Sequence, residues 1–197
     1  MAIVADNDFA IFGGTAAAIN NLLYQNSEAW PDQISNLSTL AFLLPAGDTT
    51  FYVLGMGGGG EENISGTVNG VDMTNVNVFM SSAIQSYLTG YNNGNAVAEA
   101  TFVANLADVQ TALSNLSWSS PDVNNSDTVI GLAAPNGVGF HFDDGTAHLF
   151  RFNASEVGVE TVPEPSSIGL VLISFANLML FRRRARGALR VKGSVAA

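Results

Sequence analysis

Short apolar runs separated by turn-forming residues make up most of residues 1–160. The runs are rich in β-branched and aromatic residues, which favour strands over helices. Between them, Pro45-Ala46-Gly47-Asp48 and Asn69-Gly70 have the residue types that tight turns require. The pattern predicts strands at residues 8–13, 21–24, 40–44, 50–54, 64–71 (on both sides of Asn69-Gly70), 128–130, 138–142 and 147–152.

Two segments have helical rather than strand periodicity. Asn105 can cap a helix over residues 106–116, because Leu106, Val109, Leu113 and Leu116 then fall on one face. Residues 81–88 are predicted as a second helix. Many short strands with one or two short helices predict a mainly β domain, a jelly-roll-like β-sandwich.

The last two predicted strands each contain a histidine, which raises the question of a metal site. A two-residue turn at Asp144-Gly145 would place His141 opposite His148, whereas a three-residue loop beginning at Asp143 shifts the pairing by one residue. The second register puts His148 on an apolar face and His141 on the other. The apolar face then consists of Val138, Phe140, Phe142, Phe150 and Phe152. Burying each large apolar side chain contributes about 1.5–3 kcal/mol, so we expect the second register and no paired-histidine site.

The charges divide the chain into an acidic part and a short basic end. Residues 1–165 contain all 17 acidic residues and a single basic one, Arg151, for a net charge of −16. Residues 166–197 carry a net charge of +6. So acidic a domain cannot gain affinity from releasing the counterions of nucleic acids, which excludes them as partners. The absence of cysteine excludes disulfides, thiolate nucleophiles and cysteine-ligated metals.

Three segments follow one another at the C-terminus. Val162, Pro163, Glu164 and Pro165 form an extended linker over residues 161–165, because proline fits neither a helix interior nor a central strand. Residues 166–181 are uncharged and mostly apolar. Their length as a helix, about 24 Å, is short for a membrane span and leaves a buried core helix as the alternative. The basic cluster that follows favours a transmembrane helix with residues 182–197 in the cytoplasm. That cluster is Arg182, Arg183, Arg184 and Arg186.

This order of motif, apolar span and arginine cluster resembles the PEP-CTERM sorting signal, also called the ice-binding protein C-terminal domain. The resemblance covers about 36 of the 197 residues and centres on Pro163-Glu164-Pro165. It implies a bacterial chain recognised by an exosortase, a membrane-embedded transpeptidase that cleaves near the motif. The implied route is export, a single-pass intermediate in the inner membrane, and then the cell envelope or extracellular matrix. Residues 1–160 would form the exported domain.

The N-terminus does not match that route, because residues 1–30 lack both a basic start and a sustained apolar run. Asp6 and Asp8 stand where a secretory signal would carry lysine or arginine. A start codon assigned too late, a mature-like fragment and an atypical export route would each explain this mismatch. We favour a missing N-terminal segment, and we then expect residues from Asp6 onward to belong to the folded domain.

Catalytic motifs are absent from the sequence, which predicts a protein that is not an enzyme. No GxSxG occurs, and neither histidine lies in a catalytic motif. Two converging carboxylates would suit a glycan-active enzyme, and Glu61 and Glu62, after the glycine-rich residues 55–60, are the candidates for such a pair. We expect both instead to be solvated beside a flexible loop. A phosphate-binding loop is excluded because no Lys-Ser or Lys-Thr follows the glycines.

Two binding chemistries remain open. The side chains of Asp122, Asn124 and Asp127 place oxygen atoms at spaced positions, somewhat as in a calcium-binding loop. Hydrogen bonding within a turn explains the presence of these residue types equally well. Trp30, Trp118, Tyr87 and Tyr91 can stack on sugar rings or pack in the core. The sequence thus favours a non-enzymatic envelope or matrix protein without a required cofactor. The alternative is a carbohydrate-binding or adhesive module for exopolysaccharide, with or without calcium.

Overall fold

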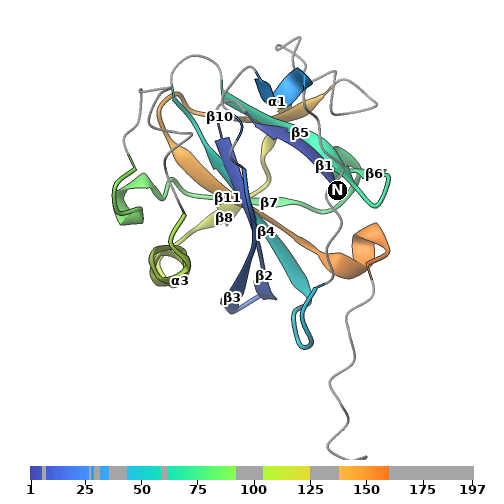
Figure 1. Cartoon of the computed structure of the whole chain (residues 1–197), viewed down its shortest axis with the longest axis horizontal. Helices are drawn as coiled ribbons and strands as arrows, with labels where there is room; N and C mark the ends of the chain where they lie inside the picture. The colour runs from blue at the N-terminus through green and yellow to red at the C-terminus, as the bar shows by residue number, and fades with distance from the viewer. Residues whose placement is uncertain are drawn as a thin grey trace, which may run out of the picture. The chain divides into compact units, whose positions relative to one another are not determined.

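Two antiparallel β-sheets form the folded part of the chain in this computed structural model (Figure 1). The structure describes residues 1–5, 8–26, 28, 32–35, 44–58, 62–91, 104–124 and 138–159. The chain divides into one unit, Met1–Val162, and a second, Pro163–Ala197, which contains none of the described residues. The prediction of a mainly β domain with two sheets is confirmed.

The smaller sheet, called sheet A here, has the strand order β1-β5-β10-β9. Its strands are β1 (Ala2–Ala5), β5 (Glu62–Val68), β10 (Gly139–Phe142) and β9 (Asp122–Asn124), and β6 (Val71–Asp72) also pairs with β5. A two-residue turn joins β5 to β6, with φ of 51° at Asn69 and 78° at Gly70. Positive φ at both positions identifies a type I′ turn, which confirms the turn predicted at Asn69-Gly70.

The larger sheet, sheet B, has the strand order β3-β2-β4-β11-β7-β8. These strands are β3 (Ala18–Gln25), β2 (Asp8–Thr15), β4 (Thr50–Met56), β11 (Ala147–Asn153), β7 (Phe79–Ser81) and β8 (Trp118–Ser119). The central strand β4 pairs over its whole length with β2 on one side and β11 on the other. Every residue of β4 is buried.

One of the two predicted helices is present and the other is wrong. The helix α3 (Leu106–Leu113) begins where Asn105 accepts a hydrogen bond from the Ala107 N–H at 2.9 Å, as a capping residue does. Residues 81–88 are instead the end of β7 followed by the 3₁₀ turn η2 (Gln85–Tyr87). Ile84 and Leu88 have helical spacing, but both side chains are buried against sheet B from this turn. The remaining short elements are α1 (Asp32–Ser35), η1 (Met73–Asn75) and η4 (Ala154–Val157).

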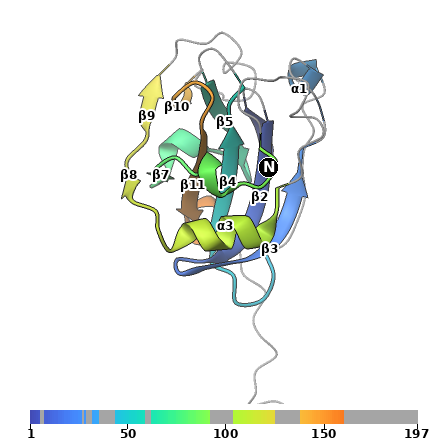
Figure 2. The same ribbon diagram turned by 90° about the vertical axis from the view of Figure 1, so that its left-hand side faces the viewer.

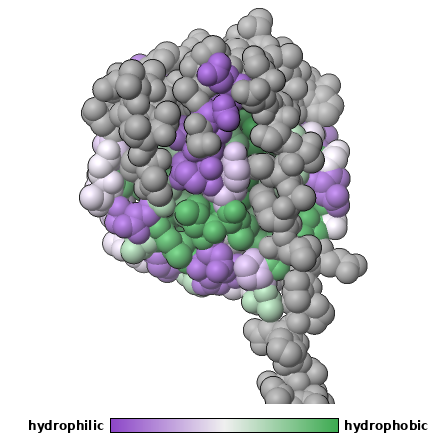
Figure 3. All heavy atoms as spheres, viewed as in Figure 1, coloured by the Kyte–Doolittle hydropathy of each residue, from purple (hydrophilic) through white to green (hydrophobic). Residues whose placement is uncertain are grey.

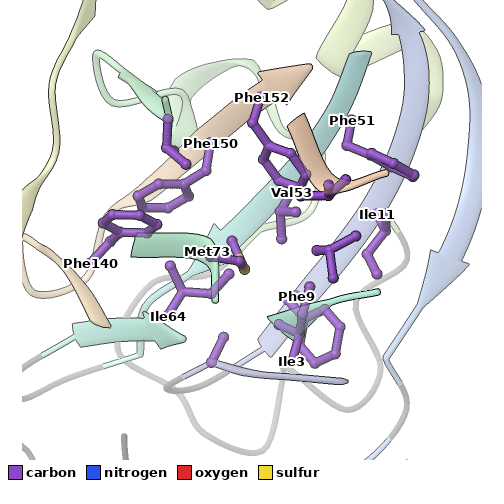
Figure 4. Close-up of a cluster of buried hydrophobic side chains, with 14 of the residues drawn as sticks. Ile3, Phe9, Ile11, Phe51, Val53, Ile64, Met73, Phe140, Phe150 and Phe152 are labelled. Carbon is purple, nitrogen blue, oxygen red and sulfur yellow. The ribbon is translucent and has the colours of Figure 1, made fainter. Parts of the chain in front are cut away.

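Aromatic side chains fill the space between the two sheets. The Phe140 ring of sheet A stacks on the Phe150 ring of sheet B, with ring centres 5.7 Å apart (Figure 4). Phe51 and Phe152, on neighbouring strands of sheet B, lie 5.5 Å apart in the same layer. Burial of such side chains is the main force that holds the sheets together.

A second hydrophobic cluster covers the opposite face of sheet B. Figure 2 shows α3 in front of this sheet. Val109, Ala112 and Leu113 of the helix are buried there against Phe12, Tyr52 and other side chains of the sheet. Leu106 is partly buried against the same cluster, which confirms the predicted apolar face for Leu106, Val109 and Leu113. The helix ends at Leu113 rather than at 116, so Leu116 reaches the cluster from beyond the helix. Sheet B is therefore the middle of three layers, with sheet A on one face and α3 on the other.

The predicted hairpin of the last two strands is wrong, although the predicted faces are right. β10 pairs with β5 and β9 in sheet A, whereas β11 pairs with β4 and β7 in sheet B. Residues 143–146 thus carry the chain from one sheet to the other. Phe140, Phe142, Phe150 and Phe152 still share one cluster, because both strands turn their phenylalanines towards the space between the sheets.

Two further predictions are wrong, and others are not tested. Gly55 and Met56 belong to β4 rather than to a flexible loop. Gly55 is also closely packed, because a Cβ there would lie 3.3 Å from the rings of Phe142 and Phe150. The fold also begins before Asp6, because β1 starts at Ala2. The predicted strand at 128–130 and residues 40–43 of another lie outside the described residues. The jelly-roll connectivity stays a prediction, since segments 92–103 and 125–137 between the strands are also outside them.

Candidate functional site

A row of aromatic side chains and one arginine crosses the outer face of sheet B. Phe12 of β2 is paired with Tyr52 of β4, Tyr52 with Arg151 of β11, and Arg151 with Phe79 of β7. Residues paired across antiparallel strands point to the same face with Cβ atoms about 4.5–5.5 Å apart. Strand pairing thus places side chains from four separate parts of the chain next to one another.

Arg151 is the centre of this row. Its guanidinium carbon lies 3.9 Å from the centre of the Trp118 ring and 5.6 Å from that of Phe79. Among the described residues, no carboxylate forms an ion pair with it, although it is the only basic residue before position 166. Contact with aromatic faces contributes about 0.5–2 kcal/mol, depending on how far the cation is removed from water. One hydrogen bond joins Arg151 to the Tyr52 hydroxyl, and the other N–H donors of the guanidinium suit a carboxylate or hydroxyl ligand.

Tyr52 forms the buried floor beside Arg151. Its hydroxyl donates a hydrogen bond to the Thr15 carbonyl oxygen at 2.5 Å, and its side chain is fully buried. Burial raises the pKa of Tyr52, while the positive charge of Arg151 acts in the opposite direction. The phenol therefore stays protonated near neutral pH, which keeps it a hydrogen-bond donor.

The two ends of the row reach solvent. Phe79 is 36% exposed, and Leu22, which is paired with Phe12 on β3, is 39% exposed. Figure 3 shows hydrophobic residues reaching the surface among hydrophilic ones on one face of the domain. A partly exposed aromatic ring beside an arginine that no described carboxylate neutralises can contact a planar or apolar ligand surface and bind an oxygen-rich group at the same time.

The aromatic residues predicted to stack on sugars have different fates. Tyr91 is anchored, because its hydroxyl donates to the carbonyl oxygens of Gly57 and Thr146. Tyr87 is partly buried against the outer cluster of sheet B. Trp118 is half-buried, with one face on Arg151, and Trp30 lies outside the described residues. Packing therefore accounts for both tyrosines, and of the three described residues only Trp118 belongs to the exposed end of the row.

The acidic pair beside the glycine-rich segment is not a solvated loop pair. Glu62 is fully buried at the start of β5, and its Oε1 atom accepts a hydrogen bond from the Gly58 N–H at 2.9 Å. A Cβ at Gly57 would lie only 2.6 Å from the Glu62 carboxyl carbon. The glycines thus let the main chain approach the carboxylate. Glu61 lies outside the described residues.

The candidate calcium ligands lie partly on a strand. Asp122 and Asn124 belong to β9 at the edge of sheet A, so residues 122–124 are extended rather than curled around an ion. Asp127 lies outside the described residues. Calcium binding by this segment stays a prediction.

The two histidines lie in different sheets and on different faces. His148 points between the sheets, with Nδ1 2.8 Å from the Ser81 carbonyl oxygen and Nε2 3.0 Å from Thr146 Oγ1. His141 lies on the outer face of sheet A, between Asn63 of β5 and Asp122 of β9. The expectation that they do not form a pair is confirmed, as are the faces predicted for each.

The sorting motif, the apolar segment and the basic cluster lie outside the described residues. These are Val162, Pro163, Glu164 and Pro165, residues 166–181, and Arg182, Arg183, Arg184 and Arg186. Within the described ranges, no helix has the length and apolar character needed to cross a membrane. Comparison of the chain with models of protein families, with curated proteins and with solved structures finds no match.

Sequence reasoning missed the row through Arg151 but had one signal for it. Arg151 was visible as the single cation of the first 165 residues. Its partners come from strands 33 to 99 positions away in the chain, and their pairing depends on which strand lies beside which. A sequence pattern fixes the face of each strand, but it does not say which strands are neighbours.

Proposed function

We propose that this chain is an exported, non-enzymatic protein of the cell envelope or extracellular matrix, and that its C-terminus is a sorting signal processed by an exosortase. The observation that supports the proposal is the order of three segments at the C-terminus. Pro163-Glu164-Pro165 precedes residues 166–181, which carry no charge, and four arginines follow within five residues. Each segment alone is common, whereas their succession resembles a PEP-CTERM signal.

The charge distribution supports the same topology. A cluster of arginines resists transfer across the membrane and holds its end of an apolar helix in the cytoplasm. The domain before the motif carries a net charge of −16, so the two sides of residues 166–181 differ strongly in charge. The interior Ser174 and Asn177 weaken this segment as a permanent anchor, which suits an intermediate that is cut later.

The described members of the two hydrophobic clusters all lie before the proposed motif. They run from Met1 to Val159. Cleavage near Pro163 would keep all of these residues in the released domain.

The experiment follows the size and orientation of the full chain behind a secretory signal in a bacterium that has an exosortase. We expect the wild type to give a membrane-bound form and a shorter processed form. Replacing Pro163, Glu164 and Pro165 with alanine should leave only the longer form. Replacing Arg182, Arg183, Arg184 and Arg186 with alanine should reduce the fraction of domains that externally added protease can reach.

The matched control replaces Arg190 and Lys192, which are basic but lie outside the cluster. It should behave as the wild type. Normal processing of the alanine-substituted motif, measured on an immunoblot, would contradict the proposal.

A second function is favoured by the exposed end of the Arg151 row. Phe79 offers an exposed ring beside a guanidinium that no described carboxylate neutralises, which is a combination that suits an oxygen-rich sugar. In this alternative the domain is a carbohydrate-binding or adhesive module that contacts exopolysaccharide. An array of neutral and uronic-acid glycans, with and without calcium, tests it. Phe79→Ala should weaken binding about tenfold, since a stacked aromatic is worth about 1 kcal/mol or more.

Leu22→Ala is the matched control, because Leu22 is as exposed as Phe79 but lies at the other end of the row. Equal losses in the two variants, or no glycan bound by the wild type, would remove this alternative.

A further inference from the structure

Three polar side chains form a second cross-strand row, on the outer face of sheet A. Asn63 of β5 is paired with His141 of β10, and His141 is paired with Asp122 of β9. Their neighbours Ile64 and Phe140 point into the core between the sheets. Because side chains alternate along a strand, Asn63, His141 and Asp122 all point to the opposite face.

Asn63 lacks the hydrogen bonds that a buried amide requires. It is 2% exposed, and neither its Nδ2 nor its Oδ1 atom has a hydrogen-bond partner in the part of the chain that the structure describes. The Nδ1 atom of the adjacent His141 is also buried and also lacks a described partner. Buried polar groups are nearly always satisfied by protein, water or an ion, so two such neighbours indicate a ligand between them.

We propose that Asn63, His141 and Asp122 bind a divalent transition-metal ion of the zinc class. An imidazole nitrogen with carboxylate and amide oxygens is a donor set that suits such ions, and calcium prefers oxygen ligands alone. His141 supplies Nδ1, Asp122 supplies its carboxylate, and Asn63 supplies Oδ1. Water completes the coordination.

The charge of the domain favours the binding of cations in general. Residues 1–165 carry a net charge of −16, which raises the local concentration of cations near the surface. The one basic residue of that stretch, Arg151, lies on the outer face of the other sheet, against Trp118. No described group contains three or more histidine, aspartate or glutamate side chains placed to hold a metal. This row has two of them and an amide, so it would hold the ion with water ligands retained.

The fold gives Asp122 a different set of neighbouring ligands from the one that the sequence predicted. In the sequence, Asp122 stands with Asn124 and Asp127, and oxygen ligands alone point to calcium. In the fold, its cross-strand neighbour is an imidazole. The partner of Asp122 thus comes from 19 positions further along the chain, and it changes the class of metal.

The test titrates Zn²⁺ into the full chain in mild detergent after treatment with a chelator. We expect Zn²⁺ at a hundred times its dissociation constant to raise the melting temperature by about 5–10 °C. His141→Gln and Asp122→Asn should each weaken Zn²⁺ binding at least tenfold. Asp144→Asn, in the turn after β10, is the matched control because it changes the net charge by as much as Asp122→Asn. It should bind Zn²⁺ as tightly as the wild type, since Asp144 is not one of the proposed ligands.

A spectroscopic measurement keeps the proposal testable if a variant folds poorly. The chain has only two histidines, so ¹⁵N-labelled histidine gives two sets of ring signals. Zn²⁺ should shift the Nδ1 signal of His141 and leave that of His148 in place. Unshifted His141 signals, no change in melting temperature, or equal binding by His141→Gln would overturn the proposal in favour of buried water. Tighter binding of Ca²⁺ than of Zn²⁺ would overturn it as well.

Discussion

The Nδ1 atom of His148 lies 2.8 Å from the carbonyl oxygen of Ser81, so one side chain ties β11 to the main chain of β7 from within the core. A carbonyl oxygen only accepts hydrogen bonds, and Nδ1 must therefore carry the proton. The ring also lies 5.7 Å from that of Phe142, which comes from sheet A. His148 is consequently a polar link among apolar side chains at the centre of the sandwich.

We predict that this histidine makes the domain less stable as the pH falls below about 6.5. Burial lowers the pKa of His148 from its ordinary value of 6.5, while the Ser81 hydrogen bond and Asp143 act in the opposite direction. The unfolded chain therefore takes up the proton first, and protonation favours unfolding. Stability should be complete above pH 6.5 and decline below it by at most about 1.4 kcal/mol per pH unit. Urea unfolding at pH 7.5 and 5.5 measures the change.

The control for this prediction is His148→Gln, whose amide can still donate to Ser81 but does not titrate. Its stability should vary less between the two pH values. An equal pH dependence in the variant would assign the effect to other groups.

Gly66 should be one of the least replaceable residues of sheet A. Its φ is +152°, and a Cβ there would lie 2.1 Å from the carbonyl oxygen of Ala2 on the adjacent β1. Gly66→Ala should therefore cost about 1–2 kcal/mol in backbone strain and a further 1–3 kcal/mol as β1 is pushed away. Gly70→Ala isolates the first contribution, because Gly70 has a φ of +78° with nothing within 4 Å. Equal losses in denaturant unfolding would refute the close approach of β1.

Removing the cap of α3 should destabilise the outer layer of sheet B. Asn105→Ala deletes the acceptor of the Ala107 N–H bond, and such losses cost about 1 kcal/mol. Asn115→Ala is the comparison at the other end of the helix, where the amide makes only long contacts of 3.3 Å to Thr111 and Ser114. It should change the free energy of unfolding by less than about 0.5 kcal/mol. Similar values for both variants would mean that the cap contributes little.

The contact between Arg151 and Trp118 should give a measurable coupling energy. A double-mutant cycle of Arg151→Met and Trp118→Leu is expected to return about 0.5–2 kcal/mol, since both variants keep apolar bulk and remove the cation or the ring. Pairing Arg151→Met with Leu22→Ala provides a reference, because Leu22 lies on β3 at the far end of the row. We expect no coupling there, and equal coupling in both cycles would point to an indirect effect of the arginine.

The sequence predicted structure best where a residue's role depends on its near neighbours in the chain. Asn105 caps α3, Asn69-Gly70 makes a tight turn, and phenylalanines alternate along the last two strands. Each of these depends on interactions within a few residues, so spacing alone predicts them.

The sequence failed where the partner of a strand had to be chosen. Alternating phenylalanines look the same in a hairpin and in two strands that face each other across a sandwich, so β10 and β11 were placed in one sheet. Glu62 was expected in water because it follows glycines, but those glycines leave room for its buried carboxylate against Gly57 and Gly58. The row through Arg151 was missed for the same reason. Phe79 lies beside Arg151 only because β7 pairs with β11, and the sequence does not show that pairing.

The full burial of β4 constrains the order in which the domain can fold during synthesis. Its seven residues, TFYVLGM, have no charge and no proline, which is the signature of a segment prone to intermolecular cross-β stacking while exposed. Its outer side is covered by α3, which begins 50 positions after the strand ends. A chain that ends before Leu106 would therefore leave the apolar outer side of β4 exposed to other chains. If the protein is exported unfolded, as its proposed route implies, a chaperone would have to protect β4 until α3 is available to cover it.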